Sequence, residues 1–589
     1  MMKVDLVKYL KKLSERRLMA VLGILVGCAC GVASVALKYA IWGIQKALSY
    51  CATGQGWNVM YLILPGIGML LAMLFVKYIV KDDISHGVTK ALVAVSKNES
   101  KIKSHNVWTS LVASSVTIGF GGSVGAEAPI VYTGAAIGSN VGRRLGLSYK
   151  NVTILLGCGA AGAVAGIFKA PLAGILFTLE ILLFNISMSS ILPLLLSTVS
   201  ATVISYLCMG QDAMFSCALE KFSMINIPFY IVLGLFCALI SVYFIRTTLN
   251  LEDKIKNIRN PWWRWGISAL LLGLLIFLFP PLHGEGYETV STLLQGSELH
   301  GEGLTKLAFI IKKEWVLPIF ILLVLLLKVF SMSLTNAGGG VGGTFGPTLV
   351  VGALAGFVVA RFLNLIFAHS AFSIPEQNFV LVGMAGLMAG VMQAPMTAIF
   401  LIAEISGGYQ LLIPLIITAT ISFALTRVVE QYSIYSKRIA KTGELLTHDN
   451  DKAVLTLMKT SDLIRDKYPR INMDATLGEL VKVISDSQAQ VFPVVDSENH
   501  FQGVVEMDSI RKLMFRTDLY KSKRVFSFME NPPEYVYDDD PMDVVMDKFD
   551  KTEAWRLPVI TRNRTYLGFI SQSRLMAAYR EELKVISHE

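Results

Sequence analysis

The sequence predicts an all-α polytopic membrane protein built from two inverted repeats with broken helices, followed by a small α/β module in the cytoplasm. Only 16% of the 589 residues are charged and 53% are hydrophobic, whereas soluble chains carry about 25% charged residues. Residues 437–589 hold 23 Lys+Arg and 25 Asp+Glu, a net charge of −2, so the part before them carries +11 and the whole chain +9. This distribution argues against an ordinary soluble enzyme and against a nucleic-acid binder.

Long uncharged runs support the membrane assignment, because a helix needs about 20 apolar residues to cross the hydrocarbon layer. Shorter segments rich in glycine, 119–129 and 338–347, interrupt this pattern. Broken helices at membrane depth occur where they are buried in protein or line a water-filled cavity, so the pattern favours a transporter or channel over a simple anchor. The runs are Leu18–Leu37, Trp57–Val76, Ile181–Gln211, Phe222–Ile245, Val329–Ala360 and Ile405–Thr426.

The flanking charges predict the orientation. Residues 1–17 form a basic amphipathic stretch, and the run after it is too long for a signal-peptide core, so we expect it to be retained. Basic residues also follow the last run, at Arg427 and Lys437–Lys441. Both termini are therefore expected in the cytoplasm, in a bacterial-type plasma (inner) membrane. The seven cysteines show no CxxC spacing, which argues against a disulfide framework and a zinc site.

The membrane part contains an internal duplication. Gly121–Pro129 (GGSVGAEAP) matches Gly339–Pro347 (GGVGGTFGP) at an offset of 218 residues. Further along, the proline of an Ala-Pro pair precedes a glutamate by nine residues in both halves, ending at Glu180 and at Glu404, an offset of 224. We infer one duplicated unit, about 18–210 and 222–436, with a site where the two copies meet.

Each motif places proline near the start of an apolar helical stretch, where its missing N–H is no loss. The free N–H groups and the helix dipole give such an end about half a positive charge. Four helix starts, before Pro129, Pro171, Pro347 and Pro395, could converge and attract an anion without a buried cation. The alternative is that the glycines only permit close helix packing.

Glu127 is the most informative single residue, because a carboxylate inside a glycine loop within an apolar stretch is costly. It could act as a tethered anion that competes with a mobile one and leaves when protonated. The alternative is a carboxylate that merely caps its helix. For Glu180 and Glu404 we favour structural hydrogen bonds over direct function.

The chain resembles the CLC family of chloride channels and proton-coupled chloride transporters over nearly its whole length. The family motifs are GxExP at Gly125–Pro129, GGxFxP at Gly342–Pro347, APLAG at Ala170–Gly174, AP at Ala394–Pro395 and a tyrosine segment at Ile434–Ser436. The resemblance implies a homodimer with one pore per subunit and chloride, or a similar small monovalent anion, as substrate.

The resemblance also assigns roles. Glu127 becomes the gating glutamate, and His86 stands where the family has its central serine, with Thr89 in place of a proline. Imidazole can donate an N–H to an anion, Ser85 could supply the hydroxyl after a one-residue shift, and His86 could also be a plain loop residue. The implied anion ligands are Ser85, His86, Gly125, Ala126, Thr344, Phe345 and Tyr435.

A second departure concerns protons. Family antiporters commonly carry an inner glutamate directly after the residue aligned with Glu180, and here that position is Ile181. Isoleucine cannot carry a proton, so the sequence predicts a channel-like, glutamate-gated pore that responds to voltage or pH. The alternative is a chloride/H⁺ antiporter that uses another acid or a water chain.

The tail contains its own repeat, because Pro493 precedes Gly503 by ten residues and Pro558 precedes Gly568 by ten. This resembles a tandem of CBS domains, over 456–517 and 518–589, joined to the membrane part (18–436) by a linker at 437–455. Such pairs can bind adenine nucleotides, and Asp508 fits the place of the ribose-contacting acid. We favour a structural or dimer-forming tail, and we expect the acidic run 538–540 to be a solvated loop.

Two other classes of protein would use buried carboxylates in a membrane. An intramembrane enzyme could use Glu127, Glu180, Glu404 and His86, and a divalent-cation transporter would need clustered carboxylates. No metal-ligand spacing or nucleophile motif is present in the sequence. We therefore expect neither catalysis nor a metal, and no cofactor beyond a nucleotide at the tail.

Overall fold

The computed structural model describes residues 14–51, 57–97, 100–182, 188–215, 219–295, 315–367, 373–441, 458 and 460–587. The chain divides into two compact units, residues 1–445 and 446–589. Each unit is described by itself below.

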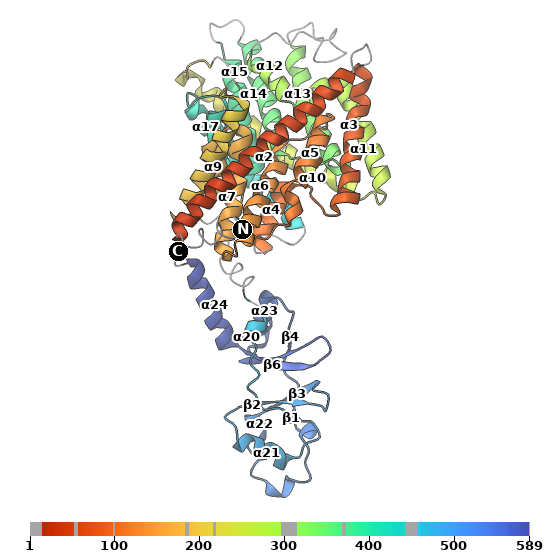
Figure 1. Ribbon diagram of the computed structural model, residues 1–589, viewed down its shortest axis with the longest axis vertical. Helices are drawn as coiled ribbons and strands as arrows, with labels where there is room; N and C mark the ends of the chain where they lie inside the picture. Colours follow the sequence, from red (N-terminus) through yellow and green to blue (C-terminus); the bar gives the residue numbers. More distant parts are fainter. Residues whose placement is uncertain are drawn as a thin grey trace, which may run out of the picture. The chain divides into compact units, whose positions relative to one another are not determined.

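The first unit is all-helical, and nine of its described helices are long and apolar enough to cross a membrane. In Figure 1, α12 and α15 lie at the upper edge of this unit and α4 at the lower edge. The helices are α2 (Glu15–Cys51), α3 (Trp57–Leu74), α4 (Gly87–Lys97), α5 (Thr109–Gly119), α6 (Glu127–Arg144), α7 (Tyr149–Phe168), α8 (Pro171–Ile181), α9 (Met188–Met209), α10 (Ile227–Lys256), α11 (Pro261–Leu278), α12 (Tyr287–Leu294), α13 (Val316–Ala337), α14 (Phe345–Ile366), α15 (Glu376–Met392), α16 (Pro395–Ile405), α17 (Leu412–Val429) and α18 (Ile434–Lys441).

Several predicted boundaries differ from the structure. The uncharged run Val329–Ala360 is divided between α13 and α14 by a turn in which Gly339 has φ +110°, a conformation that favours glycine. Helix α11 is absent from the predicted runs, and the first half of α13 is absent because Lys328 marks the start of the predicted run. Residues 15–17 belong to α2, and residues 1–13 of the amphipathic stretch lie outside the described residues.

The duplication is visible in the packing of α6 on α7 and of α14 on α15. A Cβ atom on Gly134 would lie 2.2 Å from the carbonyl oxygen of Gly159, and one on Gly352 would lie 2.5 Å from that of Gly383. The glycines let the backbones of these buried helices touch. The glycines inside these helices therefore permit close helix packing, which is the alternative given above for the glycine motifs.

The second unit contains two similar three-stranded sheets. In each sheet the first strand pairs parallel with the second, and the second pairs antiparallel with the third. Leu463, which precedes the first sheet, packs into the core of the second repeat with Val536 and Phe549. The elements are α20 (Thr460–Leu463), β1 (Ile471–Asn472), α21 (Leu477–Ser485), β2 (Val491–Val495), β3 (Phe501–Glu506), α22 (Met507–Ile510), β4 (Val536–Tyr537), α23 (Met542–Thr552), β5 (Arg556–Ile560), β6 (Tyr566–Ser571) and α24 (Gln572–Ser587).

Candidate functional site

The two glycine loops meet at the centre of the first unit. The N–H of Gly125 donates to the carbonyl of Gly343 (3.0 Å), and the N–H of Gly343 donates to that of Gly125 (2.7 Å). Hydroxyl groups of the opposite repeat hold both loops in equivalent ways. Thr335 accepts from the N–H of Ser123 (3.2 Å), and Thr117 accepts from the N–H of Val341 (3.1 Å). The site is thus a seam between the repeats.

Glu127 is the first residue of α6, and only 3% of its side chain is exposed. Its Oε2 accepts from the backbone N–H of Gly346, in the first turn of α14 (3.2 Å), and its Oε1 accepts from the Tyr287 hydroxyl (2.5 Å). A Cβ atom at Gly346 would lie 3.0 Å from both carboxylate oxygens, so glycine leaves room for the carboxylate there. The negative charge of the Glu127 carboxylate therefore lies at the start of α14, a helix of the other repeat.

The remaining ligands expected in this region divide into two groups. The N–H of Gly125 is used in the bridge to Gly343, and the N–H of Ala126 donates to Oε1 of Glu285 (3.1 Å). By contrast, the hydroxyls of Thr344 and Tyr435 are buried and meet no hydrogen-bond partner among the described residues. Two unpaired buried hydroxyls next to a helix start suit an anion.

Phe345 begins α14 and is buried. Its ring packs between Phe168 (5.5 Å between centroids) and Phe177 (6.0 Å). The side chain therefore forms an apolar wall, and only its backbone N–H could contact an anion.

His86 precedes α4 and has φ 53°. Its Nε2 lies 3.5 Å from Oε2 of Glu252, whose other oxygen accepts from Arg438 (2.8 Å). The Ser85 hydroxyl donates to Asp83 (2.6 Å), so its proton is already used. The Thr89 hydroxyl is buried and has no partner among the residues that the structure describes. His86 thus joins an ion-paired network near α18.

Glu180 and Glu404 cap each other's repeat. Glu180 accepts from the N–H groups of Met396 (3.0 Å) and Thr397 (2.7 Å) at the start of α16. Glu404 accepts from Leu172 (3.1 Å) and Ala173 (2.9 Å) at the start of α8. These contacts are the structural hydrogen bonds that the sequence favoured.

The four helix starts that could converge on one site differ in what they hold. The starts of α8 and α16 already hold carboxylates, and only α6 and α14 meet at the glycine bridge. Ile181, in the place of the inner glutamate, ends α8 with 5% of its surface exposed.

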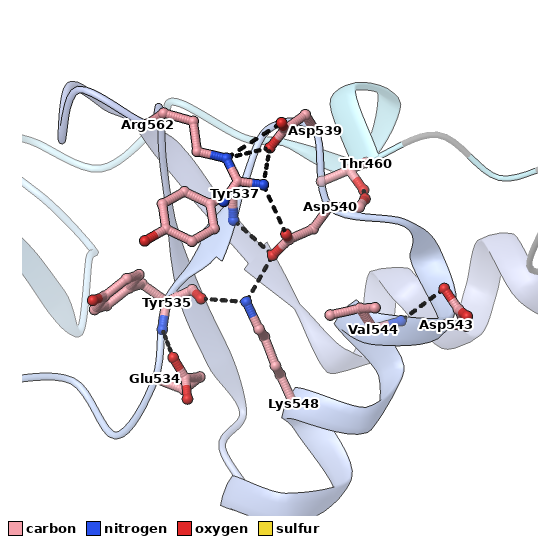
Figure 2. Close-up of polar contacts among 10 residues, drawn as sticks. All are labelled: Thr460, Glu534, Tyr535, Tyr537, Asp539, Asp540, Asp543, Val544, Lys548 and Arg562. Atoms are coloured by element: carbon pink, nitrogen blue, oxygen red, sulfur yellow. Dashed lines mark hydrogen bonds and ion pairs between the residues drawn. The ribbon is translucent and has the colours of Figure 1, made fainter. Parts of the chain in front are cut away.

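The tail places its polar residues differently from the expectation. The acidic run is not simply solvated, because Asp540 accepts from Lys548 (2.7 Å) and from the N–H of Tyr537 (3.0 Å), as Figure 2 shows. The guanidinium of Arg562, which lies between β5 and β6, contacts Asp539 in the turn after β4. These contacts fix the turn after β4.

Asp508, the nucleotide-binding candidate, is exposed and paired with Arg511. It does not line the cavity of about 420 Å³ in this unit. Three cationic side chains do line that cavity, those of Arg465, Lys467 and Arg556. Among the described residues of the whole chain, no three His, Cys, Asp or Glu side chains gather as metal ligands would.

Sequence reasoning missed Tyr287 and Glu285, which come from a segment about 160 residues away from Glu127. One signal was available. Gly284-Glu285-Gly286 places an acid in a glycine turn within a largely apolar region, the same combination that identified Glu127.

Comparison with known proteins gives the family. The family model described as "Voltage gated chloride channel" matches residues 67–427, and that of the CBS domain matches 461–516 and 525–581. The chain is 28% identical to the H(+)/Cl(-) exchange transporter ClcA of Vibrio cholerae, over 55% of this chain and 67% of that protein. It is 26% identical to the voltage-gated ClC-type chloride channel ClcB of Escherichia coli, over 56% of this chain and 75% of that protein. A solved slow cyanobacterial Cl-/H+ antiporter shares the fold with a TM-score of 0.63 at 23% identity, covering 73% of this chain and 99% of that one. The chain is therefore a multi-pass membrane protein of the CLC family of anion transporters, with two CBS domains after its membrane unit.

Proposed function

We propose that this protein exchanges chloride, or a similar small monovalent anion, for protons across a membrane, with Glu127 as the gate. The carrying observation is the position of the Glu127 carboxylate, on the N–H of Gly346 at the start of α14. Thr344, two residues before Gly346, and Tyr435 carry buried hydroxyls that have no hydrogen-bond partner among the described residues. We further propose a homodimer with both termini in the cytoplasm.

The chemistry of the site favours a weakly held anion. The start of α14 offers N–H groups at the positive end of the helix dipole. The two hydroxyls can each donate one hydrogen bond, and a buried unpaired hydroxyl costs about 1–3 kcal/mol, which a bound anion would offset. Transport requires binding that is favourable enough to enter and weak enough to leave.

Protonation explains how the gate would open. The ionised carboxylate of Glu127 occupies the N–H group that a mobile anion needs. A proton would remove its charge, weaken its hold on the helix start and let an anion take its place. This single event links the movement of the anion to the movement of a proton.

Exchange rather than a passive pore is supported by two findings. The relatives include an H(+)/Cl(-) exchange transporter as well as a chloride channel. In addition, a buried acid, Glu252, lies beside His86, so the pair offers a proton carrier even though Ile181 replaces the usual inner acid. Channel-like conduction remains the second candidate, because of that isoleucine.

The test is flux from the purified protein in liposomes, with external chloride and external pH recorded together. Exchange predicts that a chloride gradient drives protons uphill. Chloride efflux without proton movement would instead establish the passive pore. Glu127→Ala should abolish proton coupling and keep anion flux, and proton coupling that persists in this variant would contradict the assignment of the gate.

A further inference from the structure

We propose that Glu285 is a second gating carboxylate, which holds the N–H of Ala126 and must release it before an anion can bind next to Glu127. This inference rests on the proposed function of the Glu127 site. It adds a residue that no family motif in the sequence includes.

The segment 282–287 is fixed against the glycine loop of the first repeat. The N–H of Gly284 donates to the carbonyl of Gly121 (3.2 Å), and the Ser123 hydroxyl donates to the carbonyl of Leu282 (2.7 Å). At the end of this segment, Glu285 accepts from the N–H of Ala126 (3.1 Å) and Tyr287 donates to Glu127. Two consecutive residues at the start of α6 are thus held by one short segment.

The carboxylate of Glu285 interacts with buried charged groups. Lys328 of α13 is fully buried, and its Nζ donates to the carbonyls of Leu282 (3.2 Å) and Gly284 (2.9 Å). Its charge interacts with that of Glu285. The other titratable groups whose charges interact with the acid are Lys38 of α2, Glu127 of α6 and Tyr287 of the same segment.

The two carboxylates act on neighbouring N–H groups of one anion site. Glu127 occupies the N–H of Gly346, and Glu285 occupies that of Ala126. Like charges this close disfavour each other, so Glu127 takes up a proton more readily while Glu285 is ionised. Glu285 therefore both blocks an anion ligand and helps to trigger the release of Glu127.

A purely structural role is the alternative, in which Glu285 serves only as the counter-ion of the two lysines. Removing such a charge would lower stability, since a buried cation would lose its partner. It would not change the KM for external chloride, because no anion ligand would be released. The KM therefore separates the two roles, and the pH profile reports the charge of Glu285 next to Glu127.

The experiment compares wild type with Glu285→Gln in liposomes, measuring the initial anion flux against external pH and external chloride. We expect the pH of half-maximal flux to fall by about one unit, because Glu127 loses a negative neighbour. We also expect the KM for external chloride to fall, because a neutral amide holds the N–H of Ala126 more weakly. Glu288→Gln, which changes an exposed acid on α12, is the control and should match wild type.

Coupling to Glu127 is tested by the double variant Glu127→Ala with Glu285→Gln. The pH shift should vanish in it, because Glu285 acts through the protonation of Glu127. A shift that persists without Glu127, or a Glu285→Gln profile and KM that coincide with wild type, overturns the proposal.

A second variant keeps the proposal testable if Glu285→Gln does not fold. Tyr287→Phe keeps the ring and removes the hydroxyl that holds Glu127, so flux at neutral external pH should rise several-fold. Unchanged flux in this variant counts against a gate held by the segment 282–287. Failure of the proposed function itself would look different, because wild type and Glu127→Ala would then not differ in proton coupling.

Discussion

Glu180→Ala should destabilise the membrane unit by about 3 kcal/mol. In the structure the carboxylate accepts three hydrogen bonds, from the N–H of Met396, the N–H of Thr397 and the hydroxyl of Thr397. Each is worth about 1 kcal/mol net when the donor is left without a partner. The N–H groups at the start of α16 would otherwise stay unpaired in an apolar setting.

Glu404 supplies a matched comparison inside the same molecule. It accepts only two hydrogen bonds, from Leu172 and Ala173, and no hydroxyl. Glu404→Ala should therefore cost about 2 kcal/mol. The difference of about 1 kcal/mol reports the Thr397 hydroxyl, so adding Thr397→Ala to Glu180→Ala should cost little more.

The measurement is unfolding of the purified protein in detergent by denaturant, with Glu288→Ala as the exposed control. Both capping variants should keep the pH profile of anion flux, because their carboxylates lie away from the glycine bridge. If Glu180→Ala is as stable as wild type, or if it loses proton coupling while remaining stable, the assignment as a helix cap is refuted.

Three further predictions concern the site and the tail. Glu127→Ala should conduct anions with a flux that no longer depends on external pH, as measured in liposomes; a flux that keeps its pH dependence would exclude Glu127 as the gate. Tyr435→Phe should weaken anion binding about five-fold, which corresponds to about 1 kcal/mol for one hydrogen bond; titration calorimetry with chloride checks this, and an unchanged Kd would show that the hydroxyl is no ligand. A structural tail predicts that an adenine nucleotide leaves the Tm of the full-length protein unchanged; a rise in Tm that Arg556→Ala reduces more than Asp508→Asn would instead assign a nucleotide site to the tail cavity, which Arg556 lines.

The sequence was sufficient to predict the elements that depend on local patterns. The duplication, the apolar runs and the glycine loops predicted a repeated membrane fold, and the cost of a carboxylate in such a loop identified Glu127. Those features are visible because each apolar run, each glycine loop and each copy of the duplicated motif is read from residues that are close together in the chain.

What could not be predicted depends on contacts between distant segments. Nothing near Pro171 indicates that Glu404 occupies the start of its helix, since the partner lies 232 residues away. Likewise, Glu285 reaches Ala126 across 159 residues. Lys328 concealed α13 because a lysine in an apolar run reads as a boundary, whereas the fold buries its ammonium against the carbonyls of Leu282 and Gly284.

The paired hydrogen bonds between Gly125 and Gly343 mean that both halves of the membrane unit form the site together. Each half supplies one wall, and the carboxylate of the first half closes on the amide of the second. A movement of one half relative to the other by the length of a single hydrogen bond would separate the Glu127 carboxylate from the N–H of Gly346. No residue would need to change. In the proposed mechanism the affinity for the anion therefore depends on how the two halves are aligned, and a partner, lipid or bilayer thickness that shifted this alignment would change transport from a distance.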